Sequence, residues 1–173
     1  RQVFKIAGEK LVLIDFETEW WTWCDRLDVD TFNDDKIKKF ANDYLLSIKI
    51  DAEKGSGPEI AKHFNVRGYP TIIIANNMGY EVDRIVGYLD PDRFLKELHR
   101  IKKGKNTISS LLNKFQLNPN NFNTLFNLAK KYEEKGELYD KSFIDGDKTA
   151  AEWKSKNRKL VSFIWYNLKK STE

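Results

Sequence analysis

The sequence predicts an α/β domain followed by an all-α extension, and two patterns of apolar residues predict it. Short apolar runs that are typical of buried strands lie at residues 11–16, 45–50 and 71–75, with helix-like stretches between them. In the last part of the chain, apolar residues recur with a helical period instead. We therefore expect an α/β domain over residues 1–102 and a helical extension over residues 103–173.

Local signals place the other elements of the first domain. A short helix is expected to begin at Pro58, because proline is tolerated in the first turn of a helix. The segment Asn-Asn-Met-Gly at residues 76–79 is typical of a hairpin turn. A closing helix is expected over residues 91–101, since Gly104 and its polar neighbours end the helical pattern there.

The extension is expected to be helical throughout. A first segment ends at Asn118-Pro119-Asn120, and a second begins after Asn121. The second weakly resembles the first helix and turn of a tetratricopeptide repeat, through Phe122, Leu125, Phe126, Leu128, Ala129, Tyr132, Gly136 and Tyr139. A final helix over residues 149–170 carries a broad apolar stripe of Trp153, Leu160, Val161, Ile164, Trp165 and Leu168. This stripe is expected to pack in a core, and docking to another chain is the alternative.

One turn near the start of the chain gathers aromatic residues around the single cysteine. It reads Glu19-Trp20-Trp21-Thr22-Trp23-Cys24 and follows the first apolar run, which ends in Asp15-Phe16. Consecutive residues at a strand-to-helix turn point in different directions, so the three tryptophans cannot all face inward. At least one indole is therefore expected at the surface, either as part of a binding patch or as an incidental exposed ring.

The order of these features over residues 1–101 resembles the thioredoxin family. In that family a buried Asp ends the first core strand, a Trp-Cys-x-x-Cys motif opens a helix, a cis-proline loop faces the motif, and a glycine follows a hairpin. Asp15, Pro70 and Gly87 stand in the corresponding places. The resemblance implies a thioredoxin fold, with a central mixed β-sheet flanked by helices, and a relationship to thiol-disulfide oxidoreductases.

The resemblance also aligns the cysteine. In the family the buried Asp lies six positions before the first cysteine, and counting from Asp15 leads to Trp21. Cys24 then corresponds to the second, resolving cysteine, and Trp21 replaces the attacking one. The alternative register takes Cys24 as the first position and Leu27 as the second, and it needs an inserted turn before the helix.

The replaced sulfur limits the chemistry that is left. Exchange begins with a thiolate, which Trp21 cannot supply, and Cys24 alone cannot close a dithiol cycle within one molecule. Cys24 is expected to be a small buried hydrophobe, and a reactive monothiol is the alternative. Asp15 corresponds to the buried acid of the family. We expect it to be a hydrogen-bonded relic with a raised pKa, because Ser47 stands where the family places a neighbouring lysine.

The loop around Pro70 is the best-preserved functional element. The resemblance implies a cis peptide bond before Pro70 and a polypeptide that pairs with the backbone of Tyr69 as an added strand. The alternative is a turn that only stiffens the entry to the following strand. The predicted groove lies between Trp21 and Pro70, and its substrate-binding residues are Trp20, Trp23, Gly68, Tyr69 and Pro70.

Several classes of site and partner find no support. No run approaches the roughly 18 consecutive apolar residues of a membrane span. His63 and His99 lie far apart and lack ligand spacing with the cysteine, so we expect no metal, and no cofactor motif such as a phosphate loop is present. Residues 103–173 hold 14 basic and 8 acidic residues without a dense basic block, so we expect no nucleic-acid partner.

Three functions remain open. We favour a redox-degenerate thioredoxin-family protein that binds a polypeptide or partner through the predicted groove, as a chaperone-like or adaptor-like module. The second is a monothiol oxidoreductase that uses Cys24, and the third is a structural adaptor whose helical extension docks a protein partner. The chain begins at Arg1 without methionine, so either a signal peptide or an expression boundary is expected to have been removed. Thioredoxin-family proteins with the Asp-Phe-x-x-x-Trp spacing often resemble exported thiol-exchange proteins. This resemblance slightly favours an exported location, periplasmic or extracytoplasmic, over a cytoplasmic one.

Overall fold

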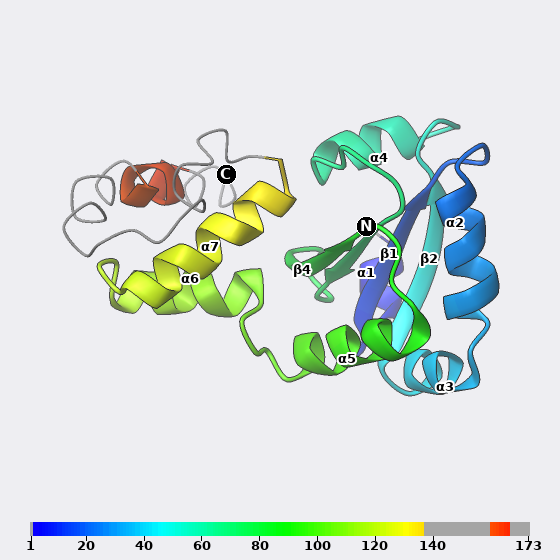
Figure 1. Ribbon diagram of the computed structural model, residues 1–173, viewed down its shortest axis with the longest axis horizontal. Coiled ribbons are helices and arrows are strands. Elements are labelled where there is room, and N and C mark those ends of the chain that lie inside the picture. Colours follow the sequence, from blue (N-terminus) through cyan, green and yellow to red (C-terminus); the bar gives the residue numbers. More distant parts are fainter. Residues whose placement is uncertain (1, 137–159, 167–173) are drawn as a thin grey trace. The chain divides into compact units, whose positions relative to one another are not determined.

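The computed structural model describes residues 2–136 and 160–166, which form two compact units that divide after Ser109 (Figure 1). Within these residues, every helix is too short or too polar to cross a bilayer. The domain boundary at residue 102 stays a prediction: the helix α5 (Pro91–Lys102) ends there, whereas the two units divide after Ser109.

The first unit is built on a four-stranded mixed sheet in the order β2-β1-β3-β4. The strands are β1 (Leu11–Glu17), β2 (Leu45–Asp51), β3 (Thr71–Ala75) and β4 (Glu81–Val86). β1 pairs in parallel with β2 and antiparallel with β3, and β3 pairs antiparallel with β4. The predicted mixed β-sheet flanked by helices is therefore confirmed, and so is the all-α character of the described part of the extension.

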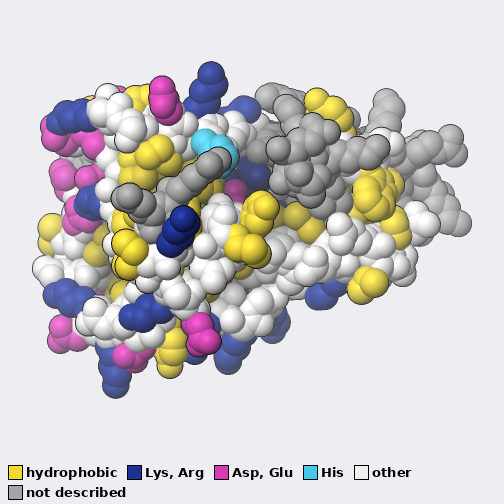
Figure 2. All heavy atoms as spheres, turned by 180° about the vertical axis from the view of Figure 1, so that it is seen from behind, with side chains coloured by type: hydrophobic (Ala, Val, Ile, Leu, Met, Phe, Trp, Pro, Cys, Tyr) yellow, Lys and Arg dark blue, Asp and Glu magenta, His cyan; other side chains and the backbone are white. Residues whose placement is uncertain are grey.

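Helices cover both faces of this sheet (Figure 1). They are α1 (Gln2–Ile6), α2 (Thr22–Arg26), the π-helix η1 (Leu27–Phe32), α3 (Asp35–Tyr44), α4 (Gly57–His63) and α5. Successive strand residues point to opposite faces, so Leu13 packs under η1, α3 and α5 while Val12 and Ile14 pack under α1 and α4. Seen from behind, hydrophobic side chains lie among charged ones on the surface of this unit (Figure 2).

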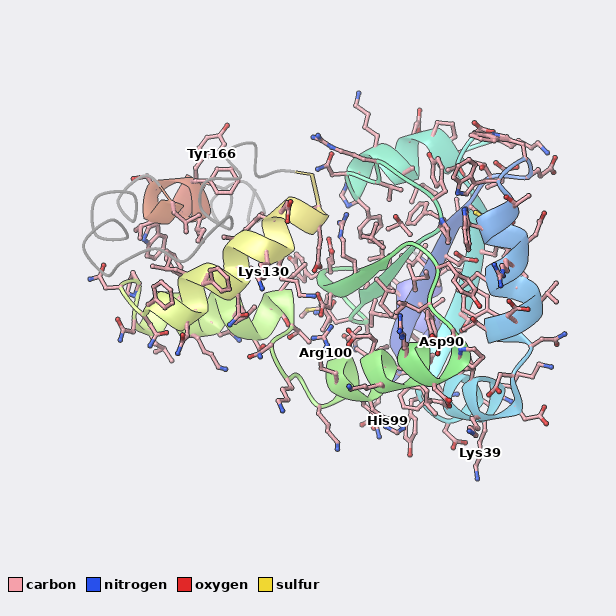
Figure 3. All side chains as sticks on the ribbon, viewed as in Figure 1. Lys39, Asp90, His99, Arg100, Lys130 and Tyr166 are labelled. Carbon is pink, nitrogen blue, oxygen red and sulfur yellow. The ribbon has the colours of Figure 1, made fainter. Side chains whose placement is uncertain are left out.

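Local chemistry sets the start of the longer helices. Asp34 caps α3 by accepting hydrogen bonds from the backbone of Lys36 and Ile37. Asp90 caps α5 in the same way, and Pro91 follows as its first residue. From α5, Arg100 reaches β4, where its Nη2 lies 2.5 Å from Oδ2 of the fully buried Asp83; Asp90 and Arg100 are labelled in Figure 3.

The second unit is helical and has its own apolar core. It contains the helix α6 (Ile108–Leu117), which spans the division between the units, the helix α7 (Phe122–Glu134) and a helical segment at residues 160–166. Its buried side chains are Leu111, Phe115, Leu125, Leu128, Ala129, Tyr132, Leu160 and Ile164. The likeness to a tetratricopeptide repeat stays a prediction. Tyr139, Trp153, Leu168 and most of the predicted final helix lie outside the described residues.

Candidate functional site

The tryptophan-rich turn forms the start of α2. Trp21 is the N-cap residue, with extended backbone angles of φ −98° and ψ 105°, and its C=O accepts a 2.8 Å hydrogen bond from the Cys24 N–H. Its side chain makes no capping hydrogen bond, because an indole carries a donor and no acceptor. Trp21 thus lies at the start of the helix, and Cys24 lies one helical turn further along it.

The turn exposes all three of its indoles. Trp20, Trp21 and Trp23 are 64%, 38% and 43% exposed. The rings of Trp20 and Trp21 meet edge to face with their centroids 5.4 Å apart, and Trp20 Nε1 donates a 2.8 Å hydrogen bond to Glu53 Oε2. The expectation of at least one exposed indole is therefore confirmed.

Tyr88 and Arg26 extend this aromatic surface. The ring centroids of Trp23 and Tyr88 lie 5.6 Å apart, and the Arg26 guanidinium carbon lies 5.4 Å and 5.3 Å from them. Arg26 Nε and the Tyr88 hydroxyl both donate to Asp30 Oδ2, at 3.2 Å and 3.1 Å. Sequence reasoning missed Tyr88, because only the folded chain brings β4 and its following loop next to the turn.

Cys24 lies behind this surface and is only 2% exposed. Burial raises the pKa of its thiol above the ordinary value, a hydrogen bond with the Thr18 backbone opposes that shift, and the charges of Asp15 and Glu17 add to it. The thiol form is therefore favoured, whereas the nucleophile in disulfide chemistry is the thiolate. The expected burial of Cys24 is observed.

We expect Cys24 to react slowly with a thiol reagent in the native protein. Ellman's reagent at about pH 8 should modify it at least about a hundredfold more slowly than in concentrated guanidinium chloride, because modification has to await local opening. The absorbance of the released thiolate gives both rates. Equal rates in the two solvents would mean an accessible sulfur and would favour the monothiol alternative.

Asp15 lies near the end of β1 and is 3% exposed, and its Oδ1 has no hydrogen-bond partner within the described part of the chain. Burial raises its pKa from 3.8 to about 7, Lys49 opposes this shift, and Asp28 and Glu17 add to it. The raised pKa agrees with the prediction. The prediction that the Asp15 carboxyl group is fully hydrogen-bonded was wrong, because its Oδ1 has no partner among the described residues.

The prediction that Asp15 lacks a neighbouring lysine is also wrong. The parallel register of β1 and β2 pairs Asp15 with Lys49, and Lys49 Nζ lies 3.8 Å from Asp15 Oδ2. Ser47 instead pairs with Leu13, and this pair lies two residues before Asp15 and Lys49 on the same face of the sheet. Strand alternation could have indicated Lys49, because residues 47 and 49 share a face, but the register between the strands could not be read from the sequence.

Lys49 is also the centre of an acidic cluster that the sequence did not reveal. Asp15, Glu17 and Asp28 each offer an oxygen, and these atoms lie within 4.8 Å of one another. Lys49 Nζ lies 2.8 Å from Glu17 Oε2 and 2.5 Å from Asp28 Oδ2. Oxygen atoms of this kind suit hard cations, but the ammonium group of Lys49 already takes that place, so we assign no metal to the cluster.

The loop around Pro70 leaves one residue with free backbone groups. The Tyr69–Pro70 peptide bond is cis, and Pro70 is buried. The Pro70 C=O accepts a 2.8 Å hydrogen bond from Gly87 N–H, and Thr71 Oγ1 donates a 2.7 Å bond to the Gly68 C=O. Neither the N–H nor the C=O of Tyr69 has a partner among residues 2–136 and 160–166.

The Tyr69 side chain lies within electrostatic range of the tryptophan-rich turn. Partial burial raises the pKa of its hydroxyl, and Glu53, Asp51 and Cys24 raise it further, so the phenol lies near all three. Glu53 is also the acceptor for the Trp20 indole. The structure thus brings Trp20, Cys24 and Tyr69 into one region of the first unit.

The sheet order, the helix that begins at the tryptophan-rich turn and the cis-proline loop together define a protein of the thioredoxin-fold class. The profile of the family described as "Thioredoxin-like domain" matches residues 1–102, and the chain belongs to that family.

Curated relatives are bacterial disulfide-exchange proteins. The chain is 34% identical over 95 residues to the thiol:disulfide interchange protein DsbD of Yersinia pestis (strain Pestoides F), a match that covers 53% of this chain and 16% of that protein. It is 31% identical over 101 residues to DsbD of Salmonella typhimurium, covering 57% and 18%. The chain thus spans about a sixth of the length of these relatives.

Solved structures agree with the fold. A Bacteroides thetaiotaomicron protein described as a candidate disulphide-isomerase is 33% identical, with a TM-score of 0.51 and coverage of 60% of this chain and 84% of that one. The DsbH oxidoreductase, at 16% identity and a TM-score of 0.52, covers 57% and 76% and shares the fold.

Proposed function

We propose that the chain is a redox-degenerate member of the thioredoxin-like family that binds an extended polypeptide. The binding surface in this proposal consists of Trp20, Trp21, Trp23, Gly68, Tyr69 and Pro70, and we name it the Trp21/Pro70 surface. Its role is that of a chaperone-like or adaptor-like module, which holds a polypeptide without exchanging a disulfide with it.

The observation that carries the proposal is the free backbone of Tyr69. An extended peptide that adds itself beside this residue can donate to its C=O and accept from its N–H, as in strand addition. Backbone pairing supplies affinity for many sequences. The exposed indoles of Trp20 and Trp21 then supply apolar contacts for the side chains of the peptide.

The state of the cysteine supports binding without chemistry. In the proposed register Trp21 takes the helix-start position from which an attacking thiolate would act, and Cys24 is a buried thiol with a raised pKa. The similarity to DsbD supports descent from proteins that exchange disulfides. The same similarity supports an exported location, which we include in the proposal.

A binding measurement with a labelled, reduced and carboxymethylated polypeptide tests this function. We expect Trp21→Ala to weaken binding at least about tenfold, because a central exposed indole contributes strongly to an interface. Met78→Ala is the matched control, since Met78 is 71% exposed on the hairpin between β3 and β4. Fluorescence anisotropy gives the Kd. Equal affinities of wild type and Trp21→Ala would contradict the proposal.

The monothiol alternative predicts a different result. A single reactive Cys24 would accelerate the reduction of insulin by dithiothreitol or the release of a glutathione adduct, and Cys24→Ser would abolish that activity. Under our proposal Cys24→Ser leaves polypeptide binding unchanged, since the buried sulfur does not touch the ligand. The two functions are thus separated by one variant and two assays.

The adaptor alternative rests on the second unit. Exposed aromatic side chains occur there, with Phe122 at 47% and Tyr166 at 62% exposed; Tyr166 is labelled in Figure 3. Aromatic residues at a surface are enriched in protein interfaces. If residues 103–173 are the docking part, polypeptide binding by the Trp21/Pro70 surface should be absent from both the full chain and a chain that ends at residue 102.

A further inference from the structure

The cluster of Trp23, Tyr88 and Asp30 shows how this chain holds a cation. The Arg26 guanidinium carbon lies over the two rings, 5.4 Å from the Trp23 centroid and 5.3 Å from the Tyr88 centroid. Arg26 Nε also donates a 3.2 Å hydrogen bond to Asp30 Oδ2. Aromatic faces attract cations, and a carboxylate adds a charge-assisted hydrogen bond. Two rings and one carboxylate thus bind one guanidinium group.

The Trp21/Pro70 surface carries a second cluster of the same composition, Trp20, Tyr69 and Glu53. Trp20 Nε1 donates a 2.8 Å hydrogen bond to Glu53 Oε2. Burial and then the charge of Glu53 raise the pKa of the Tyr69 hydroxyl, so the phenol lies near this carboxylate. Among the residues that the structure describes, no Lys or Arg pairs with Glu53 or lies over the ring of Trp20 or Tyr69. This second cluster therefore lacks a cation of its own within the described chain.

The lysine that follows Glu53 in the sequence is engaged by other carboxylates. Lys54 Nζ pairs with Glu19 and lies 3.5 Å from Asp51 Oδ2. Glu19, Asp51 and Glu53 thus place three carboxylates in this region, and Lys54 supplies one ammonium group. The excess of negative charge attracts a cationic segment and repels an acidic one.

The second cluster is open to solvent. Trp20 is 64% exposed, Glu53 is exposed and Tyr69 is half-buried. Tyr69 is also the residue whose backbone N–H and C=O have no partner among residues 2–136 and 160–166. A long cationic side chain can lay its methylene groups on apolar surface while its charged end stays in water. An arginine or lysine of a peptide bound at Tyr69 can therefore pack on Trp20 and still reach Glu53.

We propose that the polypeptide bound by the Trp21/Pro70 surface carries a basic residue, whose cationic group packs on Trp20 and pairs with Glu53. This inference rests on the proposed function and adds the chemistry of the preferred polypeptide. Arginine is favoured over lysine, because a planar guanidinium stacks on a ring while it donates to a carboxylate, as Arg26 does. Both contacts are exposed and individually weak, and together they correspond to about a fivefold preference over a neutral residue of equal size.

Three fluorescein-labelled peptides that differ only at a central position test this inference. Each is a short chain of valine and threonine with arginine, citrulline or glutamate at its centre, and citrulline has nearly the shape of arginine without its charge. We expect the full chain to bind the arginine peptide about fivefold more tightly than the citrulline peptide and at least about tenfold more tightly than the glutamate peptide. Fluorescence anisotropy gives the three Kd values. The arginine preference should shrink as the salt concentration rises from about 50 mM to about 500 mM.

Glu53→Gln isolates the charge of the carboxylate. The amide oxygen can still accept a hydrogen bond from Trp20 Nε1, whereas the negative charge is lost. We expect this variant to lose most of the arginine preference, while its Kd for the citrulline peptide stays within about twofold of the wild-type value. Glu9→Gln is the matched control, because exposed Glu9 precedes β1 and the tryptophan-rich turn follows it, roughly 20 Å away along the strand.

Reversal of the charge gives a second readout. Glu53→Lys should bind the glutamate peptide more tightly than the arginine peptide. The inference is overturned if the wild type binds the arginine and citrulline peptides equally, or if Glu53→Gln keeps the full arginine preference, and polypeptide binding still stands in both cases. If none of the three peptides binds, the proposed function fails together with this inference. The two failures are therefore distinguishable.

Discussion

Replacing Trp21 with cysteine is expected to confer disulfide reductase activity on the chain. The new sulfur would stand at the N-cap of α2, one turn before Cys24, whose N–H donates to the residue 21 C=O at 2.8 Å. A helix N-terminus lowers the pKa of a thiol there, so the introduced cysteine would be the nucleophile and Cys24 the resolving partner. The exchange cycle could then close within one molecule.

Two measurements test the effect of the Trp21→Cys substitution. Oxidised Trp21→Cys should show no free thiol with Ellman's reagent after denaturation, because a 21–24 disulfide has formed, and the protein should accelerate insulin reduction by dithiothreitol well above the wild type. Trp20→Cys is the matched control, since it makes the same change one residue earlier on the same exposed turn. A disulfide in Trp20→Cys and none in Trp21→Cys would refute the register.

Replacing Asp15 with asparagine is expected to stabilise the protein at about pH 8 and to have a much smaller effect near pH 4. At the higher pH the wild type has to keep an ionised carboxylate that is 3% exposed and has one oxygen without a hydrogen-bond partner among the described residues. The amide is neutral at both pH values. The variant therefore removes the electrostatic cost and retains the size of the side chain.

The sign of this effect follows from the direction of the pKa shift. The folded-state pKa of Asp15 is raised from 3.8 to about 7, so between these values the folded protein holds a proton that the unfolded chain has released. The contribution to stability is present below about pH 4 and is lost as the pH rises to 7. A shift of this size corresponds to roughly 4 kcal/mol in the free energy of unfolding.

Urea unfolding of the wild type and of Asp15→Asn at both pH values gives the difference in their free energies of unfolding directly. The gain of the variant over the wild type should grow by roughly 4 kcal/mol between about pH 4 and pH 8. Asp92→Asn, at an exposed carboxylate, should show no such growth. An equal difference at the two pH values would mean that Asp15 titrates normally in the folded protein.

Most of the fold could be predicted from the sequence, because its signals are local. The apolar runs at residues 11–16, 45–50 and 71–75 match β1, β2 and β3, and the expected closing helix matches α5. Pro58 lies in the first turn of α4, and the break at residues 118–120 separates α6 from α7. Each of these features depends on residues within a few positions of one another.

The candidate site was predicted only in part. The sequence pointed to Trp21, Cys24, Asp15 and Pro70, since an ordered motif needs no coordinates. It did not reveal Lys49 beside Asp15, and it indicated the wrong position, Ser47. The contacts of Trp20 with Glu53 and of Trp23 with Tyr88 were also missed, because they join residues far apart in the chain.

The sequence by itself determined the order of strands and helices and the aromatic character of the turn that holds the single cysteine. Only the tertiary structure decided that Lys49 faces Asp15 and that the backbone of Tyr69 is left without a partner among residues 2–136 and 160–166. The physical reason is that periodicity and capping are set by neighbouring residues, whereas strand register and burial depend on contacts between segments that the chain brings together only when it folds.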